Sequence, residues 1–203
     1  MRYVKLGLLK NKMLLLDIGL WYNKTRMKFD KEKFKNAVLY LAKYGGKKVG
    51  KKKLAKLLYF VDFTLYELRE KPLTGITYTK MYYGLMPEPN TFYSKLNELQ
   101  AKGIIDIKHE IKIAYCEHLI IPKKDPEIDI FDDQEKEWLK KIAEQYYSKD
   151  AGELEKIMKS EPPYQMTEKD GELTPYHLAF YRNTFGEMNL ENNANSHTFG
   201  VTR

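Results

Sequence analysis

Leucine and valine recur at intervals of three and four residues between Lys53 and Lys71, and this run constrains the fold more than any other feature of the sequence. Such spacing places the apolar side chains on one side of an α-helix. The run consists of Leu54, Leu57, Leu58, Val61, Leu65 and Leu68. We expect one long helix that ends near Lys71, before Pro72, and packs its apolar stripe against other elements.

Other helices are predicted before and after this one from their start and stop signals. Asp30 is a suitable N-cap, and Gly45 and Gly46 should end the helix that follows it, before a basic loop at Lys47–Lys53. Two of the later helices are predicted at Thr91–Lys102 and Pro175–Phe185. Asp132 and Glu135 should cap another, which runs to Tyr147. Asp150 and Glu153 should cap a fourth, which ends near Ser160. A polar loop is expected at Glu161–Thr174.

Short strands are predicted between the helices. Thr77–Tyr83 is rich in threonine and tyrosine, after which Gly84, Pro87 and Pro89 should break the chain. The apolar runs Ile104–Ile107 and Ile113–Ile121 are expected to pair as a hairpin. The predicted fold class is α+β: a mostly α-helical single domain with a small antiparallel β-sheet or hairpin, winged-helix-like in its middle part.

The chain divides into three predicted parts. Residues 1–26 form an N-terminal extension, either helical or the product of a mis-assigned start; residues 27–185 form the domain; residues 186–203 form a polar, flexible tail. Cys116 is the only cysteine, which favours a reducing, cytoplasmic setting. No stretch reaches the roughly 20 apolar residues of a membrane helix, so no membrane partner is expected.

Charge is distributed unevenly along the sequence. Residues 1–56 carry 17 lysine and arginine residues against 3 aspartate and glutamate residues, whereas the remaining residues carry 18 against 25. Such asymmetry can attract nucleic acid or an acidic partner to the N-terminal half. The alternative is a solvated lysine-rich face that has no partner.

The candidate chemical sites are weak. Gly45–Lys51 has the spacing of a phosphate-binding loop, but Lys52 replaces the required serine or threonine and a helix precedes it. His109, Cys116 and His118 fall in the predicted hairpin, where ordinary strand residues are expected and not a metal site. No base and nucleophile pair can be assembled. We therefore predict no catalytic residues, no metal and no cofactor, and a protein that acts by binding another macromolecule.

Residues 52–105 carry a family resemblance. The run Lys56–Asp62 is followed by Pro72–Gly75, Tyr78, the pair Tyr83-Gly84 with Pro87 close behind, and a helix that ends at Gly103. This order resembles the Panacea domain of the SocA-like antitoxin family, over roughly residues 28–185. The family tends to have proline directly after the Tyr-Gly pair, whereas Leu85 and Met86 intervene here.

The resemblance implies a cytosolic, mostly helical domain and an antitoxin of a type II toxin–antitoxin pair. Such a protein neutralises a cognate toxin, encoded by an adjacent gene, through direct contact. The family-motif or partner-binding candidates are Lys56, Tyr59, Asp62, Thr74, Gly75, Tyr78, Tyr82, Tyr83, Gly84 and Pro87.

Particular roles are expected for some of these residues. Tyr59, Phe60, Tyr82, Tyr83 and Phe92 could be interface anchors, although Phe60 is more readily a core residue. Asp62 is expected to order the loop after its helix, and Thr74-Gly75 to form a turn. Lys51, Lys52 and Lys53 could steer association or contact nucleic acid, an effect that salt weakens.

The alternative function is a winged-helix DNA-binding transcriptional regulator whose recognition helix is Thr91–Lys102. That helix carries only Lys95 and Lys102 as cations, against Glu98. A helix that contacts base edges usually also brings several phosphate contacts, so the sequence favours the antitoxin over this alternative.

Overall fold

The computed structural model describes residues 27–111 and 116–182. The helical elements are, in chain order, α2 (Lys31–Tyr44), α3 (Lys51–Arg69), α4 (Pro89–Ala101), the 3-10 helix η1 (Ile128–Ile130), α5 (Asp133–Gln145), α6 (Ala151–Ser160), α7 (Pro162–Met166) and the 3-10 helix η2 (Tyr176–Tyr181). The strands are β1 (Tyr78–Met81), β2 (Gly84–Pro87), β3 (Ile105–Ile111), β4 (Cys116–Pro122) and β5 (Leu173–Thr174).

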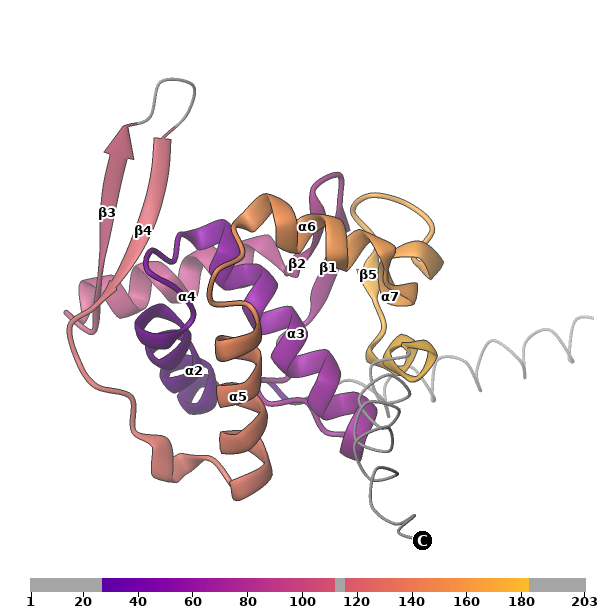
Figure 1. Cartoon of the computed structure of the whole chain (residues 1–203), viewed down its shortest axis with the longest axis horizontal. Helices are drawn as coiled ribbons and strands as arrows, with labels where there is room; N and C mark the ends of the chain where they lie inside the picture. Colours follow the sequence, from indigo (N-terminus) through magenta and orange to yellow (C-terminus); the bar gives the residue numbers. More distant parts are fainter. Residues whose placement is uncertain (1–26, 112–115, 183–203) are drawn as a thin grey trace, which may run out of the picture.

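Helix α3 is the central element of the fold (Figure 1). Every residue from Lys53 to Tyr66 is buried, because α2, α5, α6, β2, β4 and η2 all contact this helix. The predicted long helix is confirmed, with its end at Arg69 and Glu70 in the left-handed region (φ 57°). The apolar stripe is thus part of a helix that is covered on all sides.

Local capping signals place the outer helices as predicted. Asp30 accepts hydrogen bonds from the backbone of Glu32 and Lys33 at the start of α2, and Gly45 ends that helix. Asp132 and Asp150 both form complete capping boxes, at α5 and α6 respectively. These caps satisfy backbone N–H groups that have no partner within the helix.

Two small antiparallel sheets complete the fold. One has the strand order β2-β1-β5, and the other is the β3–β4 hairpin, which projects from the helical body in Figure 1. The predicted break at Gly84 and Pro87 was wrong, because these are the first and last residues of strand β2, which pairs with β1. The chain reverses at Tyr82-Tyr83, and Gly84, with a φ of +100° that glycine adopts without strain, begins β2 opposite Met81.

The predicted polar loop Glu161–Thr174 was also wrong. Its two prolines begin the short helix α7, and its end forms strand β5. Proline suits the first helical position because it lacks only an N–H that has no partner there. The predicted last helix is a 3-10 helix that ends at Tyr181, and Pro175 is its N-cap.

The fold class is confirmed as α+β and mostly helical. Helix α4 and the β3–β4 hairpin follow the order of a winged helix, and that likeness remains a prediction. The predicted extension at 1–26 and tail at 186–203 lie outside the described residues. None of the helices described is both long and apolar enough to cross a bilayer.

Candidate functional site

Asp62 organises a buried hydrogen-bond cluster on α3. Its carboxylate, which is 0% exposed, accepts from the backbone N of Thr74 at 2.7 Å, the Oγ1 of Thr74 at 2.6 Å and the hydroxyl of Tyr78 at 2.8 Å. Burial raises the pKa of Asp62 to about 6, although the hydrogen bonds oppose that rise. The prediction that Asp62 orders the following loop is confirmed.

Gly75 is required in the same loop. Its φ of +67° lies in the left-handed region, and a Cβ there would collide with the carbonyl oxygen of Lys28. The chain at Lys28 and Phe29 therefore packs directly over the predicted Thr74-Gly75 turn.

Lys56 holds the turn between β1 and β2. Its Nζ donates to the carbonyl oxygens of Tyr83, at 2.5 Å, and Leu85, at 3.3 Å. Burial lowers the pKa of this lysine to about 8. A Cβ on Gly84 would lie 2.8 Å from the Nζ of Lys56, so glycine allows the turn to approach the lysine closely.

Tyr59 links α3 to the C-terminal part of the described fold. Its hydroxyl donates to Oε2 of Glu161 at 2.6 Å, and Arg182 donates to the other oxygen of the same carboxylate at 3.0 Å. Both Tyr59 and Arg182 are buried. A buried guanidinium with a carboxylate partner fixes this segment against α3.

The sequence-predicted candidates thus divide by exposure. Most are buried, namely Lys56, Tyr59, Asp62, Thr74, Gly75, Tyr78, Gly84 and Pro87. Their side chains are shielded from solvent, and the polar groups of Lys56, Tyr59, Asp62 and Tyr78 form hydrogen bonds inside the protein. Tyr82, at 80% exposed, and Tyr83, at 37%, remain available on the surface. Phe60 and Phe92 are core residues.

A groove lies beside the first two turns of α3, and we call it the α3 groove. It has a volume of about 540 Å³, and its walls come from α3, the β1–β2 turn, β4, the start of α6 and Tyr93 of α4. Two tyrosines border it, Tyr83 and the 41% exposed Tyr93. Tyr93 was not among the residues predicted from the sequence, although its position next to buried Phe92 places it on the outer side of α4.

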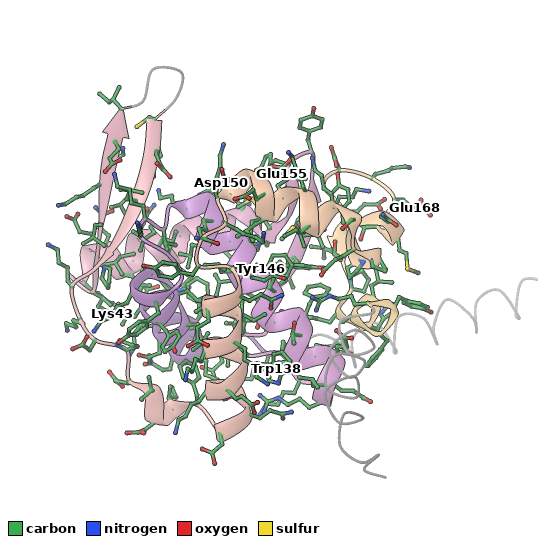
Figure 2. The ribbon with its side chains drawn as sticks, viewed as in Figure 1. Lys43, Trp138, Tyr146, Asp150, Glu155 and Glu168 are labelled. Carbon is green, nitrogen blue, oxygen red and sulfur yellow. The ribbon has the colours of Figure 1, made fainter. Side chains whose placement is uncertain are left out.

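Both signs of charge line the α3 groove. The Nζ of Lys51 lies 5.6 Å from the ring centroid of Tyr93, and burial lowers the pKa of this lysine. Asp150 and Glu155 supply negative charge from the start of α6 (Figure 2). Aromatic residues are enriched in protein-binding surfaces, whereas lysine, aspartate and glutamate are depleted from their centres, and the rim of such a surface is polar.

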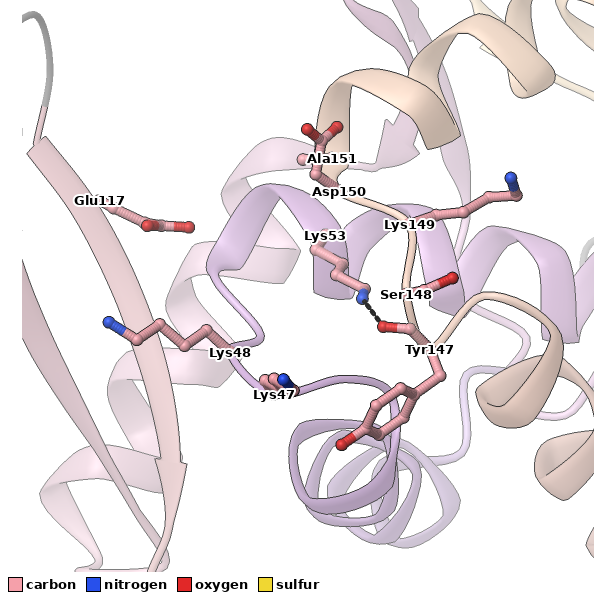
Figure 3. Close-up of a pocket in the computed structure, with 9 residues that line it drawn as sticks. All are labelled: Lys47, Lys48, Lys53, Glu117, Tyr147, Ser148, Lys149, Asp150 and Ala151. Atoms are coloured by element: carbon pink, nitrogen blue, oxygen red, sulfur yellow. Dashed lines mark hydrogen bonds between the residues drawn. The ribbon is translucent and has the colours of Figure 1, made fainter.

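A smaller hollow of about 360 Å³ adjoins the α3 groove and shares Lys53, Glu117, Asp150 and Ala151 with it. Figure 3 shows Lys53 directed at the carbonyl oxygen of Tyr147, which it contacts at 2.9 Å. Lys53 is only 6% exposed, so this lysine supports the α5–α6 connection and is not a steering charge. Lys51, Lys52 and Lys53 form the first turn of α3, and the predicted loop ends before them.

The charge asymmetry of the sequence is partly neutralised within the fold. Lysines from the basic N-terminal half pair with acidic residues from later in the chain; the pairs are Lys33–Glu135 at 2.6 Å, Lys35–Glu127 at 3.5 Å, Lys43–Asp125 at 2.5 Å and Lys48–Glu110 at 2.8 Å. Such pairs depend on tertiary contacts, so the sequence alone did not indicate them. Nucleic-acid contact by this half remains a prediction.

The cations of α4 are paired as well. Lys95 and Lys102 contact Glu98 at 2.6 and 2.7 Å. These contacts lower the pKa of Glu98 to about 2. Both lysines of the predicted recognition helix therefore have an acidic partner nearby. Because these cations are already paired, the DNA-binding alternative gains no support.

The structure brings together three residues that were predicted to be ordinary strand residues. Ligand atoms of His109, Cys116 and His118 all lie within 4.8 Å of one another. By contrast, the phosphate-loop candidate Gly45–Lys51 has no strand before it, since α2 ends at Tyr44.

A family model described as "Antitoxin SocA-like, Panacea domain" matches residues 54–165, more than half of the chain. The matched segment contains α3 from Leu54 onward, the β1–β2 turn and most of the α3 groove, but not the lysines of the first turn of α3. No curated protein and no solved structure matches the chain.

Proposed function

This chain belongs to the antitoxin SocA-like Panacea domain family, and on that premise we propose that it neutralises a toxin by binding it directly. The family match is the observation that carries the proposal. In this account the protein is the antitoxin of a type II pair, its partner is the product of an adjacent gene, and both act in the cytoplasm. Its action is binding and not catalysis.

The α3 groove is the proposed contact surface. Tyr83 and Tyr93 present aromatic area that loses little conformational entropy on binding, and such residues dominate interface energies. Lys51 and Lys52 can pair with anions of a toxin, whereas Asp150 caps α6 and Glu155 contacts Lys159 at 2.7 Å, so a cation of the toxin would share these carboxylates. A toxin held here would have its essential surface occluded.

Steering of the encounter is assigned to Lys52, with a contribution from the partly exposed Lys51. Lys53 is excluded from this role by its bond to Tyr147. Charges at the rim of an interface chiefly affect the association rate, and salt screens them.

The test is co-expression of the full chain with the adjacent gene, with growth and co-purification as readouts. The proposal predicts that the neighbour alone arrests growth, that this protein restores it, and that the two elute as one complex in size-exclusion chromatography. A harmless neighbour that forms no complex would overturn the proposal.

A matched pair of variants tests the proposed surface. The double variant Tyr83→Ala/Tyr93→Ala should fold but fail to rescue growth. Tyr181→Ala removes a tyrosine that is 59% exposed on η2, away from the groove, and should rescue fully. If the double variant rescues growth, the contact surface is not the α3 groove.

A further inference from the structure

The register of the β3–β4 hairpin gathers three residues of metal-ligating types, two histidines and one cysteine, on one face. His109 pairs directly with His118, and Ile111 pairs with Cys116. Side chains alternate along a strand, so Cys116 and His118 project from the same face as His109. Closer to the helical body, that face carries the buried residues Ile107 and Ile120.

The distances suit a shared ion after small side-chain rotations. The Sγ of Cys116 lies 4.0 Å from Nδ1 of His109, and the ring centroids of His109 and His118 lie 4.5 Å apart. Two tetrahedral zinc ligands, one sulfur and one nitrogen, lie about 3.5 Å apart when their bonds to zinc are about 2.3 and 2.0 Å long. His109 and Cys116 are exposed, so rotation of their side chains can close the difference.

His118 adds an independent observation. Its Nδ1 is shielded from solvent and has no hydrogen-bond partner among the described residues. A buried polar atom without a partner carries a free-energy cost that a metal bond would remove. Cys116 and His118 also line the α3 groove, so an ion on this face would lie at the groove wall.

We propose that His109, Cys116 and His118 bind a thiophilic divalent ion of the zinc class. Two imidazole nitrogens and one thiolate form a donor set that suits Zn²⁺, whereas Mg²⁺ and Ca²⁺ require oxygen ligands. The thiol of Cys116 loses its proton on binding. Three protein ligands leave a fourth position for water. The ion would cross-link β3 to β4 beside the groove, and this proposal does not depend on the antitoxin function.

The test uses the full chain, purified without a polyhistidine tag and stripped of metal by a chelator that is then removed. Co²⁺ is the probe because Zn²⁺ has no visible absorption. We expect one equivalent of Co²⁺ to give tetrahedral bands and a thiolate charge-transfer band, both of which Zn²⁺ abolishes. Cys116→Ser should lose the charge-transfer band.

Variants measure the contribution of each histidine. His109→Ala and His118→Ala should each weaken Zn²⁺ binding by more than the roughly 10–100-fold that loss of an outer-shell partner costs. His177→Ala, a change on η2, should leave binding unchanged. Zn²⁺ should raise the thermal midpoint of the wild type and not that of Cys116→Ser.

Two results would overturn the proposal. One is the absence of a thiolate band with Co²⁺. The other is Zn²⁺ binding that His109→Ala and Cys116→Ser leave unchanged. Toxin binding is measured separately on the metal-free protein, so failure of this site and failure of the antitoxin proposal are distinguishable.

Discussion

The two halves of α3 differ in how their polar side chains are used. Around Asp62, in the second half, each oxygen of the carboxylate has a partner inside the protein and the surrounding rings are buried. Around Lys51 and Lys52, at the start of the helix, cations and tyrosines border an open groove. The family match begins at residue 54, so it includes the second half of α3 and excludes Lys51 and Lys52. In our proposal, only the first turns of α3 contact a partner.

This difference distinguishes residues that stabilise the fold from residues that are exposed to a partner. Asp62, Thr74 and Tyr78 specify a loop conformation, because a buried carboxylate requires donors placed around it. Tyr83 and Tyr93 satisfy no such requirement, and their exposure leaves them available to a partner. We infer that the buried motif maintains the fold and the groove contributes the specificity for a toxin.

The largest predicted effect is the loss of the buried cluster. Asp62→Ala removes the acceptor of three hydrogen bonds and should lower the free energy of unfolding by about 4 kcal/mol, since each unsatisfied buried donor costs roughly 1–3 kcal/mol. Urea denaturation measures the change. Asp133→Ala, which changes an exposed aspartate, should alter stability by less than about 0.5 kcal/mol. Equal effects of the two variants would contradict the comparison.

The same carboxylate should make stability depend on pH. Burial raises its pKa from 3.8 to about 6, so the folded protein binds a proton at a higher pH than the unfolded chain does. The contribution of Asp62 to stability is therefore fully present below pH 3.8 and falls by roughly 3 kcal/mol as pH rises through about 6.

Asp62→Asn isolates this effect because asparagine does not titrate. The stability advantage of the wild type over Asp62→Asn should shrink as pH rises from about 4 to 7, as followed by urea denaturation at each pH. An advantage that stays constant with pH would mean that Asp62 titrates alike in the folded and unfolded states.

On the groove side, Tyr83→Ala should weaken toxin binding by about 2 kcal/mol, roughly thirtyfold in Kd, as expected for an interface anchor. Calorimetric titration measures the affinity, and urea denaturation verifies that the variant remains folded. Tyr181→Ala serves as the exposed control. If Tyr83→Ala leaves the affinity unchanged, the β1–β2 turn is not part of the interface.

The smallest predicted effects distinguish two neighbouring lysines. Lys53→Met should cost about 1 kcal/mol of stability through loss of the bond to Tyr147, with no change in association rate. Lys52→Gln should slow association and reduce its dependence on salt without changing stability. Stopped-flow measurements at several salt concentrations give the association rate. Slower association of Lys53→Met, with no change for Lys52→Gln, would contradict this assignment.

Local signals explain what the sequence could predict. The N-cap at Asp30 and the capping boxes at Asp132 and Asp150 depend only on residues within one turn. Glycine and proline were ambiguous, because the same residues that end an element can begin strand β2 or helix α7. The positions of glycine and proline thus predicted where an element ends, but not whether a strand or a helix begins there.

Long-range contacts explain what the sequence could not predict. Glu161 lies 102 residues from Tyr59, and Glu135 lies 102 residues from Lys33, so neither partner could be read from spacing. Exposure is also a tertiary property: Tyr59 and Tyr83 look alike in the motif, but one is buried and the other lines the groove. The candidate site therefore became visible only in the folded structure.

Binding of a toxin at the α3 groove can be mapped by hydrogen–deuterium exchange of the protein with and without the product of the adjacent gene. Binding there should give new protection in segments 50–56, 82–93 and 150–155, which border the α3 groove. No change is expected at 173–181, in β5 and η2. Protection confined to β5 and η2, with the groove unchanged, would contradict binding at the groove.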